Sequence, residues 1–225
     1  MSNLCLTLGS DTGLPGFGYD AIMNPEIKTE IAAAAARMIA QDGADYGSAK
    51  RKAARQILGE SQARDLQDIL PDNEQIEEEV RLYHALYNAD THPAHLFRLR
   101  GLALQVMEML EQYQPFLTGS VLYGTAGMHD DIHLQVFVDS AKEVEIYLLN
   151  KNLQIEISES PHFRGPRFDD VETVSFMWKN VGVHVELYEQ DDLRGAKKKS
   201  GDKLLRADIS EVRSILTNSS HPAQQ

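Results

Sequence analysis

The chain has 225 residues, 42% of them hydrophobic, which suffices for one large domain or two small ones with a real core. Its formal net charge of −12 repels phosphate polymers, so the composition argues against non-specific nucleic-acid binding. The single cysteine, Cys5, excludes an internal disulfide and zinc sites built on cysteine pairs, and no apolar run approaches the roughly 20 residues that cross a bilayer.

These features predict a cytoplasmic protein with no membrane partner. Residues 1–22 contain four glycines and have neither a positively charged start nor a sustained apolar segment, so they predict a flexible leader rather than a signal peptide. The next part, residues 23–113, predicts a helical domain because apolar residues recur at helical spacing between capping and terminating residues. The expected helices cover residues 25–42, 46–58, 63–70 and 73–87, and another follows Pro93.

The composition changes at Pro115, after which β-branched and aromatic residues occur in short runs. Residues 114–218 therefore predict a mixed α/β domain, and residues 219–225 a frayed tail. The expected strands are Phe116–Leu122, Ile132–Val138, Leu153–Ser158, Thr173–Lys179 and Val183–Tyr188, and the expected helices are Ala141–Leu149 and Asp208–Leu216. Helices followed by a mixed sheet indicate the α+β class.

One pattern of small, acidic and histidine residues in the second half of the chain is typical of a binding or catalytic site. Gly119 and Ser120 precede ten residues of turn-like sequence, after which Asp131 and His133 lie two apart at the start of an expected strand. Side chains two apart on a strand point to the same face. Glu186 lies within a later apolar run. Carboxylates gathered in this way hold divalent metal ions in enzymes that transfer nucleotidyl groups.

From Phe116 to about Glu189 the chain resembles the nucleotidyltransferase superfamily, which has the polymerase-beta-like fold. The resemblance implies that Gly119 and Ser120 contact a nucleoside triphosphate. It also implies that Asp131 and Glu186 are catalytic and hold Mg²⁺ or Mn²⁺, with His133 in the place of the second acid. Since magnesium prefers oxygen ligands, histidine at this position predicts nucleotide binding with altered or lost transfer.

The sequence is also compatible with other roles for these residues. The glycines can simply shape a turn, with Asp130 or Asp131 capping it and residues 132–138 forming a half-buried strand. His184 shares a strand face with Glu186, so these two residues with Asp131 and His133 form an alternative His/carboxylate metal cluster. A further possibility is a noncatalytic interaction protein in which the acidic helix at residues 73–89 forms the surface for a protein partner.

A second resemblance covers most of the chain from Met23. With residues 45–53 and the run Gly124-Thr125-Ala126, the chain is similar to short bacterial proteins often labelled UDP-N-acetylmuramate-alanine ligase. That label implies ATP-dependent peptide-bond formation. Ligases of this kind hold ATP phosphates with a glycine-rich loop that ends in Gly-Lys-Thr or Gly-Lys-Ser, and neither tripeptide occurs in this chain.

Overall fold

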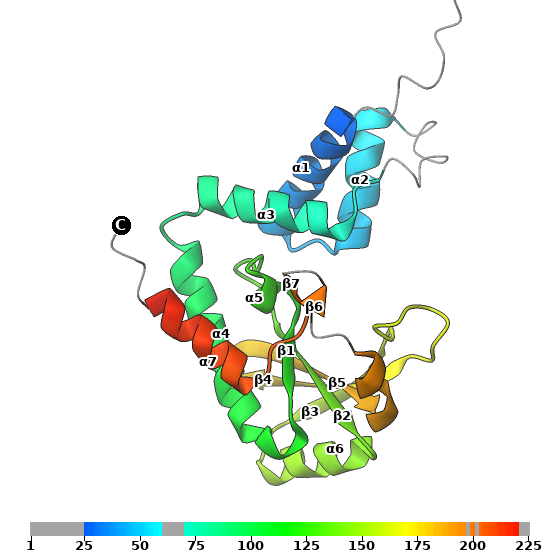
Figure 1. Ribbon diagram of the computed structural model, residues 1–225, viewed down its shortest axis with the longest axis vertical. Coiled ribbons are helices and arrows are strands. Elements are labelled where there is room, and N and C mark those ends of the chain that lie inside the picture. Colours follow the sequence, from blue (N-terminus) through cyan, green and yellow to red (C-terminus); the bar gives the residue numbers. More distant parts are fainter. Residues whose placement is uncertain (1–24, 60–69, 197–198, 201–202, 221–225) are drawn as a thin grey trace, which may run out of the picture.

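A computed structural model describes residues 25–59, 70–196, 199–200 and 203–220 (Figure 1). Helices dominate the first half and a mixed five-stranded sheet the second, which confirms the α+β class. The expected leader, residues 63–69 of the expected helix at 63–70, Lys197 and Lys198, and the last five residues of the tail lie outside the described residues. Within the described part, no helix has the length and apolarity that a bilayer crossing requires.

Three helices form a unit with its own core: α1 (Pro25–Asp42), α2 (Tyr46–Leu58) and α3 (Asn73–Tyr87). The side chain of Asp45 caps α2 by accepting from the Ser48 backbone N–H at 2.9 Å, and Asp72 begins α3 with a reciprocal capping box. Alanines fill much of the contact between these helices. The fully or almost fully buried residues of this core are Ile31, Ala32, Ala35, Ala36, Ala49, Ala53, Ala54, Ile76 and Val80.

The sheet has the strand order β1-β2-β5-β4-β3. Its strands are β1 (Phe116–Thr118), β2 (Ile132–Val138), β3 (Ile155–Ser160), β4 (Val171–Trp178) and β5 (Val181–Glu189). Only the central pair, β2 with β5, is parallel. A two-residue turn joins β4 to β5, and both of its residues, Lys179 and Asn180, have positive φ as tight hairpins require.

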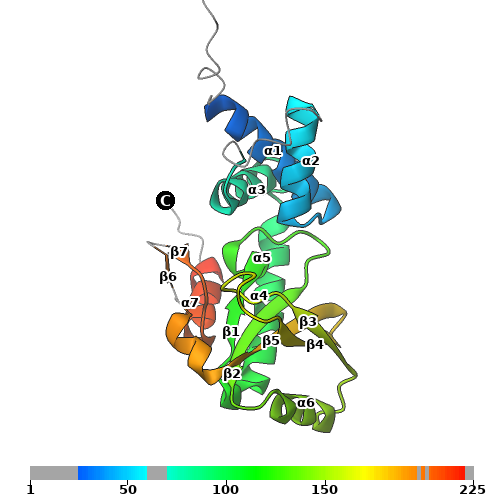
Figure 2. The same ribbon diagram turned by 90° about the vertical axis from the view of Figure 1, so that its right-hand side faces the viewer.

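One face of the sheet is apolar and packs against helices (Figure 2). The covering helices are α4 (His92–Met109) and α6 (Ala141–Asn150), and α7 (Ile209–Ser220) packs on α4. The sequence predicts that residues up to 113 belong to the N-terminal helical domain. Instead, α4 shares its core with the sheet, because its buried side chains, among them Leu99 and Val106, meet the apolar strand residues.

The expected strand at Phe116–Leu122 is wrong in its second half. Strand β1 ends at Thr118, and residues Gly119–Tyr123 form the short helix α5. Gly119 has φ +72°, a left-handed conformation that breaks the strand and that a side chain would strain. The sequence analysis also missed four short elements: η2 (Glu111–Tyr113), η3 (Gln190–Gly195), β6 (Lys199–Ser200) and β7 (Lys203–Leu204).

The core packing generates a stability prediction. Leu134 on central strand β2 is completely buried, whereas Leu149 on α6 is 53% exposed. Replacing Leu134 with Ala should lower the free energy of unfolding by about 2–5 kcal/mol, because it leaves a cavity in the core. The matched substitution Leu149→Ala should lower the free energy of unfolding by less than about 1 kcal/mol. Chemical denaturation of both variants measures the difference, and equal costs would contradict this description of the core.

Candidate functional site

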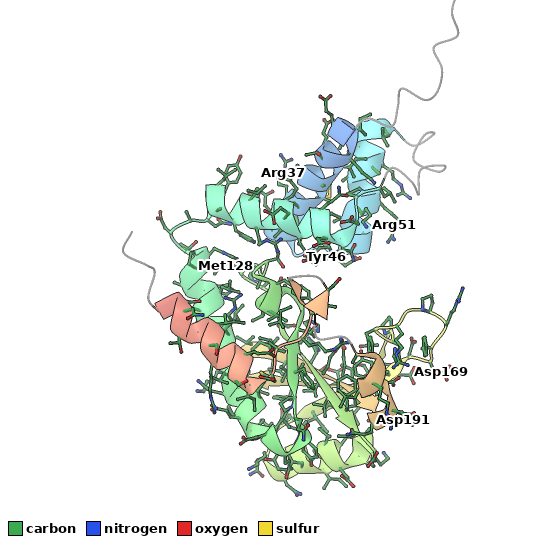
Figure 3. The ribbon with its side chains drawn as sticks, viewed as in Figure 1. Arg37, Tyr46, Arg51, Met128, Asp169 and Asp191 are labelled. Carbon is green, nitrogen blue, oxygen red and sulfur yellow. The ribbon has the colours of Figure 1, made fainter. Side chains whose placement is uncertain are left out.

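A cleft of about 510 Å³ lies between the helical unit and the polar face of the sheet. One wall comes from the connection between α1 and α2, residues 43–45, and from Tyr46 at the start of α2; Figure 3 shows Tyr46 on the side of the helical unit that faces the sheet. The opposite wall comes from β1, β2 and β5. All the residues selected from the sequence line this cleft: Gly119, Ser120, Asp131, His133 and Glu186.

The parallel register of β2 and β5 places the polar side chains in adjacent pairs. His133 lies opposite His184, and Gln135 lies opposite Glu186. Because side chains alternate along a strand, these four residues share one face of the sheet, while their neighbours in sequence fill the apolar core on the other face. The polar face of the sheet therefore carries a concentrated set of titratable groups.

Asp131, just before β2, has hydrogen-bond partners at both carboxylate oxygens. Its Oδ1 accepts from the Gly182 backbone N–H at 3.1 Å, and its Oδ2 lies 3.0 Å from Nε2 of His184. The site also requires a glycine at position 182, since a Cβ there would lie 2.5 Å from the carboxylate carbon. The backbone of β5 thus approaches Asp131 closely and orients it.

Glu186 belongs to a second network on the same face. Its Oε2 accepts from the Tyr188 hydroxyl at 2.7 Å and from Nε2 of Gln135 at 2.9 Å, and Gln135 in turn accepts from the guanidinium of Arg206. Burial and the neighbouring Glu186 raise the pKa of Tyr188, so its hydroxyl stays protonated and remains a donor. Burial lowers the pKa of Arg206 from its ordinary value.

His133 occupies the position at which the resemblance implies an acid. Its ring stacks on that of His184, with centroids 4.9 Å apart. Burial, and then the charge of His184, lower the pKa of His133, which favours the uncharged ring. An uncharged imidazole there supplies neither the negative charge nor the oxygen that magnesium prefers.

The predicted metal site of Asp131, His133 and Glu186 is not assembled. Among the described residues, no group of three or more His, Cys, Asp or Glu side chains is placed to hold a metal ion. Both oxygens of Asp131 and one oxygen of Glu186 already accept hydrogen bonds within the protein. The residues present therefore do not fit the two-metal centre that the resemblance implies.

The lining of the cleft is acidic and aromatic. Among the described residues that line it, none is lysine or arginine. Hydrogen bonds from Ser48 lower the pKa of Asp45, which keeps this cap ionised. The acids that line the cleft are Asp45, Asp130, Asp131 and Glu186, and the aromatic residues are Tyr46, Tyr123, Phe163 and Tyr188. A ligand here meets aromatic rings for stacking and a negative potential.

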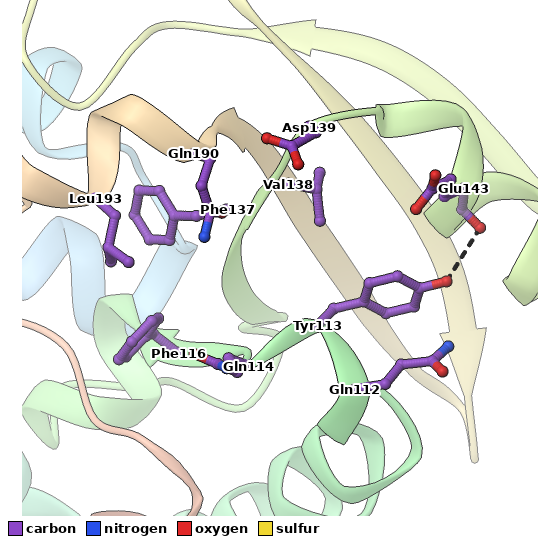
Figure 4. Close-up of a pocket in the computed structure, with 10 residues that line it drawn as sticks. All are labelled: Gln112, Tyr113, Gln114, Phe116, Phe137, Val138, Asp139, Glu143, Gln190 and Leu193. Carbon is purple, nitrogen blue, oxygen red and sulfur yellow. Dashed lines mark hydrogen bonds between the residues drawn. The ribbon is translucent and has the colours of Figure 1, made fainter.

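A smaller cavity of about 210 Å³ lies elsewhere in the structure and contains none of the residues selected from the sequence (Figure 4). Phe116 and Phe137 contribute aromatic rings that meet edge to face, with centroids 6.0 Å apart. The Tyr113 hydroxyl donates to the backbone carbonyl of Glu143 at 3.2 Å. This cavity lacks the histidines and the carboxylate networks of the cleft, which makes the cleft the stronger candidate site.

Neither a protein-family model nor a curated protein sequence matches this chain significantly. The case for the cleft therefore depends on its own geometry. That geometry also identifies residues that the sequence analysis missed, namely Gly182, Gln135, Tyr188 and Arg206. Alternation of polar and apolar residues along 132–138 and 181–189 is the sequence signal for the strand residues, whereas nothing near Arg206 in the sequence indicates its place beside Gln135.

Histidines from α3 and α4 hold the loop that leads into the site. His92 Nε2 lies 3.1 Å from the carbonyl oxygen of Ala126, and His95 Nε2 lies 2.9 Å from that of Gly127. The ring of His84 stacks on that of His92, with centroids 3.9 Å apart. Burial lowers the pKa of His84, and burial together with the neighbouring His84 lowers the pKa of His92 to about 4.

This arrangement predicts a pH dependence of stability. The unfolded chain protonates His92 near the ordinary histidine pKa of 6.5, whereas the folded chain does so only near a pKa of about 4. The unfolded state then binds more protons, so the stability contributed by His92 is present above about pH 6.5 and is lost as pH falls toward 4. The substitution His92→Gln keeps a hydrogen-bond donor but removes the titration, and should flatten the dependence in this window.

Chemical denaturation at a series of pH values between 7 and 4 measures the effect. His129→Gln, in the exposed part of the same loop, is the matched control and should retain the wild-type slope. If His92→Gln shows the same slope as the wild type, His92 does not carry the effect.

Proposed function

We propose that the cleft binds a nucleoside triphosphate and that the protein has lost metal-dependent nucleotidyl transfer. The observation that carries this proposal is the convergence of Gly119, Ser120, Asp131, His133 and Glu186 in one cleft. Four of these residues come from the segment that leads from β1 into β2, and Glu186 joins them from β5, which is far away in the sequence. The aromatic rings of Tyr46 and Phe163 on the same walls offer surfaces for a base to stack on.

The negative charge of the cleft favours a nucleotide bound as its magnesium complex over a free triphosphate. Asp45, Asp130, Asp131 and Glu186 would repel a free triphosphate, and no lysine or arginine is found among the described lining residues to offset them. A magnesium complex carries less negative charge. Magnesium is also commonly bound through one or two carboxylates together with substrate phosphates. In this proposal the metal therefore arrives with the nucleotide and is not resident in the protein.

The loss of transfer follows from how the carboxylates are used. Nucleotidyl transfer needs metal ions that stabilise the attacking and leaving oxygens. Asp131 is held by Gly182 and His184, and Glu186 by Tyr188 and Gln135, while His133 provides no oxygen ligand. We further propose that the protein acts in the cytoplasm, where triphosphates are available and Cys5 stays reduced.

Calorimetric titration with ATP, CTP, GTP and UTP tests this function directly. We expect at least one of them to release or absorb heat with magnesium present and to give a weaker signal without it. Release of pyrophosphate should stay at the background rate. Replacing Asp131 with Ala should weaken the heat, because the wall of the cleft loses the hydrogen bonds of Asp131 to Gly182 and His184 and one of the negative charges that attract the magnesium ion.

The control is Asp169→Ala, which removes an exposed carboxylate from a loop outside the cleft and should leave binding unchanged. Titrations of the wild type that give no heat with any triphosphate would contradict nucleotide binding. Rapid release of pyrophosphate that depends on Asp131 would instead contradict the loss of transfer.

A second candidate function is that of a noncatalytic interaction protein. A groove of about 700 Å³ follows α1 and α3, and large apolar side chains beside it are exposed: Leu82 at 46%, Leu86 at 75% and Tyr87 at 70%. Exposed apolar surface of this kind often marks contact with another protein. The titrations separate the two functions, since an interaction protein of this kind would give no heat with any triphosphate.

A further inference from the structure

A serine, a histidine and an aspartate form a continuous chain of hydrogen bonds on the polar face of the sheet. Ser175 on β4 lies opposite His184 on β5, and its Oγ is 2.8 Å from His184 Nδ1. The other ring nitrogen of His184, Nε2, is 3.0 Å from Oδ2 of Asp131. Three adjacent segments of the sheet therefore contribute one residue each.

The direction of these hydrogen bonds follows from their chemistry. An ionised carboxylate only accepts, so the proton shared with Asp131 lies on His184 Nε2. In the neutral ring Nδ1 is then an acceptor, and the hydroxyl of Ser175 donates to it. Because the Gly182 backbone N–H holds the other oxygen of Asp131, the carboxylate orients the imidazole toward Ser175. A base oriented in this way activates a serine hydroxyl.

We propose that Ser175 is an activated nucleophile and that the protein hydrolyses small, activated carboxylic esters. This activity goes beyond nucleotide binding, and two of its three residues, Ser175 and His184, lie outside the proposed nucleotide contacts. The roles are distinct: Ser175 attacks, His184 transfers the proton, and Asp131 positions His184. The ring nitrogen that faces the serine is Nδ1, and in the neutral ring this nitrogen can accept the serine proton because Nε2 carries the ring hydrogen.

The reaction conserves atoms and charge in two steps. Ser175 Oγ forms a bond to the ester carbonyl carbon while its proton passes to His184 Nδ1. The bond to the leaving oxygen then breaks, and that oxygen takes the proton from His184 as the alcohol departs. Water next attacks the acyl-serine, giving a proton to His184. The same proton returns to Ser175 Oγ as the carboxylic acid leaves.

The exposure of the relay determines the class of substrate. The side chains of His184 and Asp131 are 31% and 42% exposed, and Met177, the next residue on the same face of β4, is 63% exposed. Water therefore reaches the site and hydrates the oxyanion that forms during attack, in place of an enclosed oxyanion pocket. Such a site favours esters with good leaving groups, such as aryl esters, over amides, whose poorer leaving groups require stronger stabilisation.

Two measurements on the full-length protein test the proposal. A fluorophosphonate probe should label Ser175, as located by mass spectrometry of the digested protein, and p-nitrophenyl acetate should be hydrolysed above the background rate. Ser175→Ala should remove the label and lower hydrolysis about 100-fold or more, within the contribution expected of nucleophile and base. His184→Gln should slow both labelling and hydrolysis, because the substituted side chain cannot take the proton from Ser175 Oγ.

The control is Ser158→Ala, which removes an exposed hydroxyl from the neighbouring strand β3 and should change neither measurement. Circular dichroism and thermal melts of each variant confirm that it is folded. Absence of label on Ser175 in the folded wild type would overturn the proposal, as would equal hydrolysis by wild type and Ser175→Ala. These outcomes are independent of the nucleotide titrations, since Ser175→Ala should bind nucleotide as the wild type does.

Discussion

The parallel pairing of β2 with β5 is the constraint on which the site depends. It sets His133 beside His184 and Gln135 beside Glu186, and it brings the backbone of Gly182 against the carboxylate of Asp131. The same pairing sends the alternate residues of both strands into the apolar core under α4 and α6. A slip of one residue would exchange the two faces and place the charged groups in the core. Packing of the core therefore holds the polar site in register.

As a consequence of this register, the carboxylates of Asp131 and Glu186 accept hydrogen bonds from other groups of the protein. A buried or half-buried carboxylate must be neutralised or hydrogen-bonded, and in metal-dependent transferases metal ions serve that purpose. Here imidazole, amide, hydroxyl and backbone N–H groups do so instead. Because protein groups rather than metal ions hydrogen-bond these carboxylates, we propose that a nucleotide enters the cleft together with a bound magnesium ion. For the same reason Asp131 is available to orient His184 toward Ser175.

Local patterns predicted local structure well. The ends of α2 and β2 in the structure agree with those expected from the sequence. Capping residues, glycine and strand alternation are signals that involve only a few neighbouring residues. The strand position of Glu186 was likewise predicted, whereas the expected strand at 116–122 missed the break at Gly119; the residues selected from the sequence nevertheless line one cleft. The sequence did not predict which residues lie opposite one another on neighbouring strands, since periodicity does not specify register. Nothing local showed that α4 packs with the sheet, that Gly182 touches Asp131, or that Arg206 reaches Gln135.

Within the described residues, Asp131 and Glu186 accept hydrogen bonds from protein groups, and on this ground we infer that the cleft holds no resident metal ion. Paramagnetic resonance of Mn²⁺, titrated with the nucleotide-free protein, measures this directly because bound manganese loses the sharp signal of the free ion. We expect the signal of free manganese to remain at its full intensity at stoichiometric protein. One or more tightly bound ions per chain, released by both Asp131→Ala and Glu186→Ala, would contradict the account.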